Sequence, residues 1–309
     1  MNTFTKIKVV GIGGSGSNAI SRMKKCKIRG VELIAINTDA QDLVKARADL
    51  KLRIGRKTTE GLGTGMNPEI GRKSALENRQ EISEILKGAN MVFITCGLGG
   101  GTGTGASPVV AEIAKELGIL TLAVVTKPFS FEGQVRQRFA ENGFKKLKEK
   151  VDTLISISND KLLSTLDQSI PLANAFWVCD DTLRQAVQGI SDLILLPGII
   201  NVDFADIRAI MASAGSALFG VGRAEGEGRA GKAALAAINS PLLDISIKGA
   251  RGILFNVSGG KDISLSEINE VASVITQEVN PEAKIIFGAV QDERLKKGEI
   301  KVTVIATGF

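Results

Sequence analysis

The sequence contains no histidine and no tyrosine, and Trp177 is its only tryptophan. Without histidine there can be no Ser-His-Asp or Cys-His catalytic arrangement and no His-ligated metal. Any general base must be a carboxylate, a thiolate or a metal-bound water. The three cysteines, Cys26, Cys96 and Cys179, are odd in number and far apart, so neither a disulfide framework nor a CxxC zinc site is indicated. A reducing cytoplasm fits this usage.

Long apolar runs are also missing. The longest, over residues 193–200, is interrupted by Pro197 and Gly198, and it falls well short of the roughly 18 residues of a membrane span. The N-terminal segment breaks into glycines after a short strand-like run, so it does not read as a signal peptide. We predict a cytoplasmic protein without direct membrane insertion.

The charge balance is basic, with a net charge of +6 and basic clusters at 22–29, 45–57 and 145–150. Such clusters could attract nucleic acid or an anionic membrane. Aromatic residues make up only 4% of the chain and none lie between these basic residues, which argues against a stacking platform for single strands. We interpret the clusters as a solvated surface and predict no nucleic-acid partner.

Strand-like and helical segments alternate through the first half of the chain. Strands are expected at 7–13, 31–36, 91–96, 119–125 and 151–158, and helices at 16–27, 69–87, 107–117 and 131–150. Ser107 and Pro108 have the chemistry of an N-cap and a first helical residue. The alternation predicts an α/β fold with a parallel sheet and helices on both faces.

A long helix is expected next, over residues 172–196, where apolar residues recur every three or four positions. At about 1.5 Å per residue it would be roughly 37 Å long. Pro197 and Gly198 should end it. Strand-like runs at 217–222, 252–258, 284–290 and 300–308 then indicate a second α/β domain. The expected division is 1–170, 171–197 and 198–309.

Two glycine-rich segments follow predicted strands. The first, over residues 11–16, fits G-x-G-x-x-G, a weak signal for a dinucleotide fold. An NAD site also needs an acidic residue at the end of the second strand, and Asn37 stands there instead. The second segment, over residues 97–105, is more specific, because consecutive glycine N–H groups before a helix form a cradle for phosphates. Thr102 and Thr104 add hydroxyl donors.

Two lysine-containing segments only partly fit a P-loop. Residues 226–232 match G-x-x-x-x-G-K, but Ala233 replaces the residue whose hydroxyl would bind Mg²⁺. Residues 71–74 do not end in the G-K-[S/T] sequence of a P-loop. We interpret both as ordinary turns and helix starts.

With these loops in place, the chain resembles the FtsZ family, the bacterial and archaeal relatives of tubulin. The motif GGGTGTG at 99–105 is the family's phosphate loop, and further matching segments occur in the family's order at 11–19, 37–41, 61–75, 124–136, 158–163 and 201–211. The resemblance covers essentially the whole chain. It implies a tubulin/FtsZ-like fold: a parallel-sheet nucleotide-binding domain, a long central helix and a smaller C-terminal α/β domain.

The resemblance implies GTP or GDP as the ligand, with Mg²⁺ at the phosphates and K⁺ as an open alternative. Glu132 and Arg136 match ribose and guanine contacts, and their spacing would put both on one helix face. Asn159 and Asp180 would hydrogen-bond the guanine edge, with Phe176 stacking on it. The remaining implied binding residues are Gly13, Gly14, Ser15, Ser17, Asn18, Asn37, Gly99, Gly100, Gly101, Thr102, Gly103, Thr104 and Gly105.

Asn201, Asp203 and Asp206 match the family's synergy loop, within residues 198–206, and are the implied catalytic residues. The long helix separates Asp180 from Asp203, so these carboxylates are expected to position water on the nucleotide of the next subunit in a head-to-tail filament. An alternative is that Asp203 only caps the following helix.

The leading hypothesis is a GTP-hydrolysing protein that polymerises with itself and forms the scaffold of the prokaryotic division ring, at the division site. One alternative is a GTP-binding structural filament with weak hydrolysis, used in DNA or plasmid positioning. The other is a soluble NAD enzyme. Division-protein tethers are expected partners by resemblance, although the family's usual C-terminal tail is absent from this sequence, which stops directly after a strand.

Overall fold

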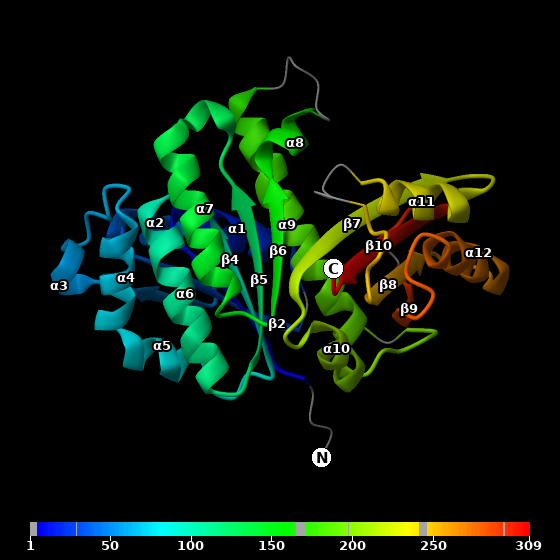
Figure 1. The fold of residues 1–309 in the computed structure, drawn as a ribbon, viewed down its shortest axis with the longest axis horizontal. Helices are drawn as coiled ribbons and strands as arrows, with labels where there is room; N and C mark the ends of the chain where they lie inside the picture. The colour runs from blue at the N-terminus through cyan, green and yellow to red at the C-terminus, as the bar shows by residue number, and fades with distance from the viewer. Residues whose placement is uncertain (1–4, 29, 165–170, 197, 241–245, 293) are drawn as a thin grey trace. The chain divides into compact units, whose positions relative to one another are not determined.

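The structure is a computed structural model that describes residues 5–28, 30–164, 171–196, 198–240, 246–292 and 294–309. The chain divides into two compact units, Met1–Gln188 and Gly189–Phe309. The boundary lies inside helix α9, which spans Leu172–Leu195. Figure 1 shows the elements of each unit. The three-part division expected from the sequence stays a prediction.

The first unit is built on a parallel sheet with the strand order β3-β2-β1-β4-β5-β6. The strands are β1 Ile7–Ile12, β2 Val31–Asn37, β3 Leu50–Arg53, β4 Met91–Gly97, β5 Leu120–Lys127 and β6 Thr153–Ser158. Five of them were expected from the sequence, and β3 was not. Because every neighbouring pair is parallel, the carboxyl ends of all six strands meet at one edge of the sheet.

Helices cover both faces of this sheet. They are α1 Gly13–Lys25, α2 Ala40–Lys45, α3 Arg56–Thr59, α4 Pro68–Glu77, α5 Arg79–Leu86, α6 Gly101–Glu116, α7 Gln134–Lys148 and α8 Asn159–Ser164, with a 3₁₀ turn η1 at Ser130–Glu132. In Figure 1, α6 and α7 lie in front of β4 and β5. Apolar side chains of α4 to α7 form one core with the sheet, and α1 packs on β1, β2 and β4.

Several helix boundaries differ from the sequence prediction. The helix expected over 69–87 is two helices, because Asn78 interrupts it. The side chain of Asn78 accepts from the N–H of Gly55 (2.8 Å) and donates to Glu81 (2.5 Å). The helix expected over 131–150 is divided into η1 and α7 by Gly133, whose φ of +96° is incompatible with a continuous helix.

The second unit holds the sheet β7-β10-β8-β9, in which β10 is antiparallel to β7 and β8, and β8 is parallel to β9. Its elements after α9 are α10 Phe204–Met211, β7 Gly215–Glu225, α11 Arg229–Ile238, β8 Gly252–Gly259, α12 Leu265–Thr276, β9 Lys284–Gln291 and β10 Glu299–Thr307. Helices α11 and α12 share an apolar core with the sheet. The four expected strands are confirmed.

Two details of the second unit bear on the sequence predictions. The P-loop-like segment 226–232 is a helix start, as expected: α11 begins after Gly228, and Lys232 donates to the carbonyl of Glu227 (2.8 Å). Pro197, expected to end the long helix, lies outside the described residues.

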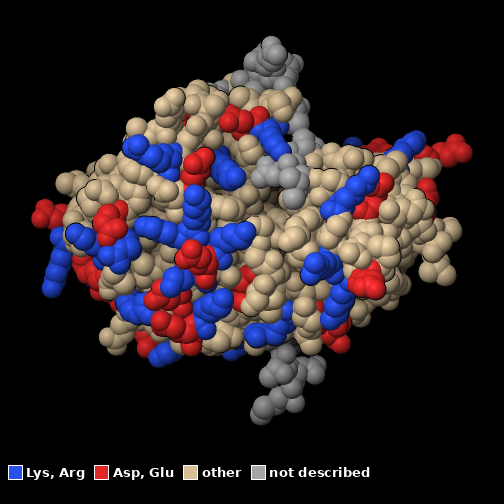
Figure 2. Space-filling model, in the orientation of Figure 1, with Lys and Arg blue, Asp and Glu red and all other residues tan. Residues whose placement is uncertain are grey.

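Charges of both signs are mixed on the surface. Figure 2 shows Lys and Arg side chains interspersed with Asp and Glu on the face in view. Ion pairs account for part of this pattern, including Arg79 with Glu116 (2.5 Å) and Lys150 with Glu112 (2.8 Å). At these places the positive charge of the lysine or arginine is offset by a neighbouring carboxylate. In the described segments, no helix is both long enough and apolar enough to cross a membrane.

Candidate functional site

The first glycine segment forms a helix N-terminus rather than a separate loop. β1 ends at Ile12 and α1 begins at Gly13, so the helix expected from residue 16 starts three residues earlier. Gly13 has a φ of +74°, which lets the chain turn directly from strand to helix. The first turn of an α-helix leaves its N–H groups without intrahelical partners, so this turn presents backbone donors.

The second glycine segment also begins a helix, at Gly101. The sequence prediction placed this helix start at Ser107 and Pro108, which was wrong: Pro108 lies inside α6, and the Ser107 hydroxyl bonds back to the carbonyl of Gly103. The glycines of this first turn let the helix pack closely on α4. A Cβ on Gly105 would overlap the carbonyl oxygen of Pro68. Tertiary packing therefore outweighs the poor helix propensity of glycine here.

Hydroxyl groups fix the second segment in place. The N–H of Gly99 donates to Thr104 Oγ1 (2.8 Å), and the hydroxyls of Thr38 and Thr102 share a hydrogen bond of 2.7 Å. Thr64 Oγ1 lies 3.4 Å from Thr102 Oγ1. The two threonine side chains expected as ligand donors thus first serve to hold the segment, and both are buried.

The N-termini of α1 and α6 meet. A Cβ placed on Gly13 would lie only 3.0 Å from the backbone nitrogen of Gly103. Each helix end carries a partial positive charge and free N–H donors. Two such ends side by side form a site suited to an anion, and phosphate groups bind at helix N-termini in this way.

A cavity of about 330 Å³ opens beside α1 and reaches to the start of α9. It brings together eight of the predicted binding residues: Gly14, Ser15, Asn18, Glu132, Arg136, Asn159, Phe176 and Asp180. The other predicted binding residues do not line it; they are Gly13, Ser17, Asn37, Gly99, Gly100, Gly101, Thr102, Gly103, Thr104 and Gly105.

The side chain of Asn37 forms hydrogen bonds within the protein, away from the cavity. Its amide donates to Asp42 Oδ2 (2.6 Å), and its Oδ1 accepts from the N–H of Thr38 (2.8 Å). Burial raises the pKa of Asp42, with the nearby Asp39 charge adding to the effect. Asn37 therefore stabilises the start of α2 rather than facing the cavity.

Asp180, on α9, forms one end of the cavity together with Asn159 and Phe176. Its carboxylate accepts from Arg22 of α1 at 3.2 Å. Burial raises the pKa of Asp180 to about 6, and the Arg22 guanidinium opposes the rise. The Oδ1 of Asn159 is buried without a hydrogen-bond partner among the described residues. A purine edge with N–H donors would satisfy both groups.

Glu132 and Arg136 form the side of the cavity. The prediction that both lie on one face of a single helix was wrong. Glu132 ends η1, whereas Arg136 belongs to α7, which begins after Gly133. They nevertheless form an ion pair at 3.0 Å, and Glu132 also accepts from the N–H of Phe129 (2.9 Å). This pairing holds the Arg136 guanidinium at the cavity wall.

The cavity has five further lining residues that were not named as binding residues: Gly97, Leu98, Thr126, Pro128 and Cys179. The first four follow or end β4 and β5. Ligands of parallel sheets bind beyond the carboxyl ends of the strands, so this rule was a usable signal for them. Cys179 precedes Asp180 on α9, and its place beside Asp180 follows from that position.

The three predicted catalytic residues lie in the second unit. Asn201 precedes α10, and its Oδ1 accepts from the N–H of Gly198 (2.7 Å). Asp203 occupies the N-cap position of α10, but its side chain makes no capping hydrogen bond. Asp206 is in the first turn of α10. All three are exposed.

The described residues offer no cluster of side chains that could hold a metal ion by themselves. Within the described ranges, no group of three or more Asp, Glu, Cys or His side chains is placed to bind one. A Mg²⁺ ion at this site would therefore take most of its ligands from phosphate oxygens and water, which is common for this ion.

Family models match both units. Residues 6–167 match "Tubulin/FtsZ family, GTPase domain", and residues 215–309 match "FtsZ family, C-terminal domain".

Solved structures resemble the whole chain. An empty FtsZ dimer from M. jannaschii is 48% identical with a TM-score of 0.95, covering 100% of this chain and 89% of that one. A mutant FtsZ from the same organism gives the same identity and TM-score, with 99% and 92% covered. CetZ2 from Haloferax volcanii, in a GTPγS-bound protofilament, is 21% identical with a TM-score of 0.82, covering 98% and 92%, which indicates a shared fold.

Proposed function

Since the chain belongs to the tubulin/FtsZ family, we propose that it polymerises head to tail into filaments that form the scaffold of the prokaryotic division ring. Guanine-nucleotide binding and GTP hydrolysis follow from the GTPase-domain match and the FtsZ neighbours. Self-association is supported by the FtsZ dimer among the similar structures. The assembly form, the catalytic residues and the cellular role belong to the proposal.

One observation carries the nucleotide placement. The N-termini of α1 and α6 meet beside a cavity whose far end holds Asp180 and Asn159. We place the phosphates at the helix ends, where backbone N–H groups and two helix dipoles favour negative charge. The guanine then lies at the far end. An ionised Asp180 accepts hydrogen bonds from the N1–H and N2–H₂ groups of guanine, and Asn159 forms a further hydrogen bond to the same edge of the base.

The side chains around the middle of the cavity orient the nucleotide. Glu132 accepts hydrogen bonds from ribose hydroxyls, and Arg136, held by Glu132, approaches the sugar and base. Phe176 is 41% exposed, and its ring meets Phe129 edge-on at 5.3 Å, which leaves a face for stacking on the base. Together these contacts fix the position of the terminal phosphate relative to the protein.

Hydrolysis in this proposal needs a second subunit. Asp203 and Asp206 follow the C-terminal end of α9, and α9 rises roughly 22 Å from Asp180 to Leu195. We therefore assign these carboxylates to the nucleotide of the next subunit, where they hold the attacking water and accept its proton. Asn201 fixes the turn before them. A bound Mg²⁺ would supply positive charge against the phosphate oxygens. Since each subunit uses two different surfaces, stacking continues into a filament.

Phosphate release at several protein concentrations tests the proposal. Activity per molecule should rise steeply above an assembly threshold. Asp206→Ala should bind GTP normally but hydrolyse slowly, and Asp180→Ala should bind poorly while keeping its catalytic carboxylates. Mixing the two should restore turnover above the sum of the separate activities. The matched control is Glu282→Ala, an exposed carboxylate of the second unit outside the proposed site, which should behave as wild type.

Three outcomes would contradict parts of the proposal. Constant activity per molecule on dilution, with no rescue in the mixture, places hydrolysis within one chain. Filament formation with full GTP binding but negligible phosphate release from the wild type favours a structural filament. Copurification of NAD instead of a guanine nucleotide removes the nucleotide assignment altogether.

A further inference from the structure

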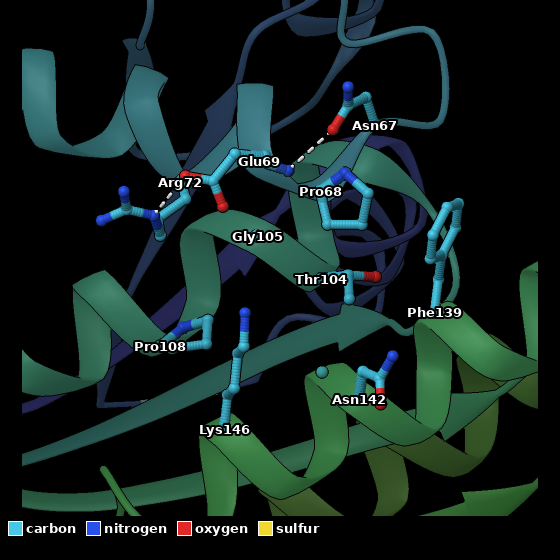
Figure 3. Close-up of a pocket in the computed structure, with 11 residues that line it drawn as sticks. Asn67, Pro68, Glu69, Arg72, Thr104, Gly105, Pro108, Phe139, Asn142 and Lys146 are labelled. Carbon is cyan, nitrogen blue, oxygen red and sulfur yellow. Dashed lines mark hydrogen bonds and ion pairs between the residues drawn. The ribbon is translucent and has the colours of Figure 1, made fainter.

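A second cavity, of about 260 Å³, lies within the first unit and shares no lining residue with the first cavity. Figure 3 shows its walls, which come from α4 and the residue before it, α6 and α7. The lining residues are Asn67, Pro68, Glu69, Arg72, Thr104, Gly105, Pro108, Phe139, Asn142, Gly143 and Lys146. The function proposed above makes no use of this cavity, although two of its lining residues, Thr104 and Gly105, belong to the predicted phosphate loop.

The cavity is kept open by close backbone packing around it. A Cβ on Gly105 would overlap the carbonyl oxygen of Pro68, and a Cβ on Gly143 would overlap the Thr104 methyl group. The three helices already touch at these points, so they cannot move closer to fill the space. The cavity is thus a fixed feature of the packing and not a gap that a small side-chain motion closes.

The interior of the cavity is mainly apolar. Pro68, Pro108 and Phe139 contribute rings from three different helices, and Gly105 and Gly143 contribute bare backbone. Rings and backbone of this kind form flat walls. Such walls suit a planar apolar group and offer few hydrogen bonds to a sugar or a peptide.

The charges at the rim leave one cation unpaired. Arg72 donates to Glu69 at 2.8 Å, so these two charges offset each other. Lys146 extends from α7 along the cavity in Figure 3, and it has no ion pair within 4.0 Å among the described residues. The hydrogen bond from Arg72 is the main cause that lowers the pKa of Glu69, and the charge of Lys146 adds to it at longer range, so that carboxyl stays ionised at neutral pH. The net charge offered to a ligand is therefore positive.

We propose that this cavity is a binding site for small organic carboxylates with an aromatic body. The ring would lie against Pro68, Pro108 and Phe139, and the carboxylate would pair with Lys146 and accept from the amide of Asn142. The volume of about 260 Å³ is just below the range of about 300 to 1,000 Å³ typical of small-molecule sites, so it suits a ligand with one ring. The proposal does not rest on the function proposed above.

Fluorine NMR with 4-fluorophenylacetate tests the site directly. The protein is used as the full chain, saturated with GDP so that the first cavity is occupied. Fragments of this size bind with dissociation constants of about 1 mM. The neutral analogue 4-fluorophenylacetamide should bind at least fivefold more weakly, because it lacks the charge that pairs with Lys146.

Two variants and a matched control locate the binding. Lys146→Met keeps the apolar part of the side chain and should weaken the binding of 4-fluorophenylacetate at least fivefold. Lys145→Met removes the adjacent exposed lysine, which does not line the cavity, and should change affinity less than twofold. Asn142→Phe places a ring over the cavity and should abolish binding. The thermal midpoint of each variant reports whether it is folded.

The proposal is overturned if the acid and the amide bind equally. It is also overturned if the two lysine variants behave alike, or if Asn142→Phe binds as wild type does. Binding seen only without GDP would place the probe in the first cavity and would equally remove the second site.

Discussion

Arg22 donates to Asp180 at 3.2 Å across 158 positions of sequence, and this pair fixes the carboxylate that closes the end of the cavity where we propose that guanine binds. Both side chains are largely buried, and the guanidinium of Arg22 also lies 5.1 Å from the centre of the Trp177 ring. The three residues form one cluster between α1 and α9. Arg22 does not line the cavity, so its effect on the ligand acts through Asp180.

The first prediction concerns the pH dependence of binding. The pKa of Asp180 is raised to about 6, so the protonated form gains population below that pH and cannot accept from both guanine donors. GDP affinity should fall about tenfold from pH 7.5 to pH 5. Arg22→Met removes the stabilising cation and should move the midpoint to higher pH. Titration calorimetry at several pH values measures both.

A control is needed because the terminal phosphate also titrates near pH 6. Asp180→Asn cannot titrate and isolates that contribution. Identical profiles for wild type, Arg22→Met and Asp180→Asn would contradict the role of the pair.

The stability of the folded protein should depend on pH in the opposite direction from GDP affinity. The raised pKa of Asp180 favours the folded state at low pH, and this contribution is lost as the pH rises through about 6.

Trp177 provides an optical test of the same cluster. It is 51% exposed, does not line the cavity and is the only Trp or Tyr in the chain. GDP binding should shift its emission, because Trp177 lies on the same stretch of α9 as Phe176 and Asp180, which line the cavity. Arg22→Met should change the emission without nucleotide by removing the cation above the ring. Emission that responds to neither change would separate Trp177 from the site.

The three thiols should differ sharply in reactivity. Cys26 is exposed, whereas burial raises the pKa of both Cys96 and Cys179 to about 12. The thiolate is the reactive form, so at pH 8 one thiol should react quickly with Ellman's reagent. All three should react in guanidinium chloride. Cys26→Ser should remove the single fast reaction, and a second fast thiol in the native protein would show that Cys96 or Cys179 becomes exposed.

Arg229 is expected to stabilise the second unit. It is 8% exposed and donates to Asp262 (2.7 Å) and Glu267 (2.6 Å). Arg229→Met leaves these carboxylates without their cation and should cost about 2 kcal/mol of unfolding free energy, reduced from the fully buried value because Asp262 is partly exposed. Arg223→Met, in a more exposed pair with Glu299, is the matched control and should cost less than about 1 kcal/mol.

The same ion pairs predict an acid effect. The hydrogen bond from Arg229 lowers the pKa of Glu267 below its usual range. A lowered pKa contributes stability above the unfolded value of about 4, and that contribution is lost as the pH falls through the folded value. Thermal midpoints measured from pH 7 to pH 3 should fall less steeply in Arg229→Met. Parallel curves would contradict this account.

The strands other than β3 could be predicted from the sequence. Continuous apolar runs such as residues 91–96 have few alternatives to a buried strand, and β4 forms there. The starts of α1 and α6 were placed too late. Glycine disfavours helices locally, and only the contact of α6 with α4 shows why helical geometry begins at Gly101.

Some residues of the candidate site could also be predicted from the sequence, and others could not. Asp180, Asn159 and Phe176 were assigned by resemblance, and the structure brings them to one cavity. Arg22 had no sequence signal, since a basic residue on an amphipathic helix normally faces solvent. Its role depends on a contact with a helix that begins 150 residues later, as the positions of Arg22 and Leu172 show. Spacing patterns within one helix cannot report such a contact.

The glycine contacts between α4 and α6 limit how the chain can be altered and repaired. A methyl group on Gly71 would overlap the carbonyl oxygen of Gly101, and one on Gly105 would overlap that of Pro68. These obstacles are main-chain atoms, which every amino acid carries. A genetic screen starting from Gly105→Ala should therefore yield reversion to glycine rather than suppressors at neighbouring positions, since no second side-chain substitution removes the blocking oxygen.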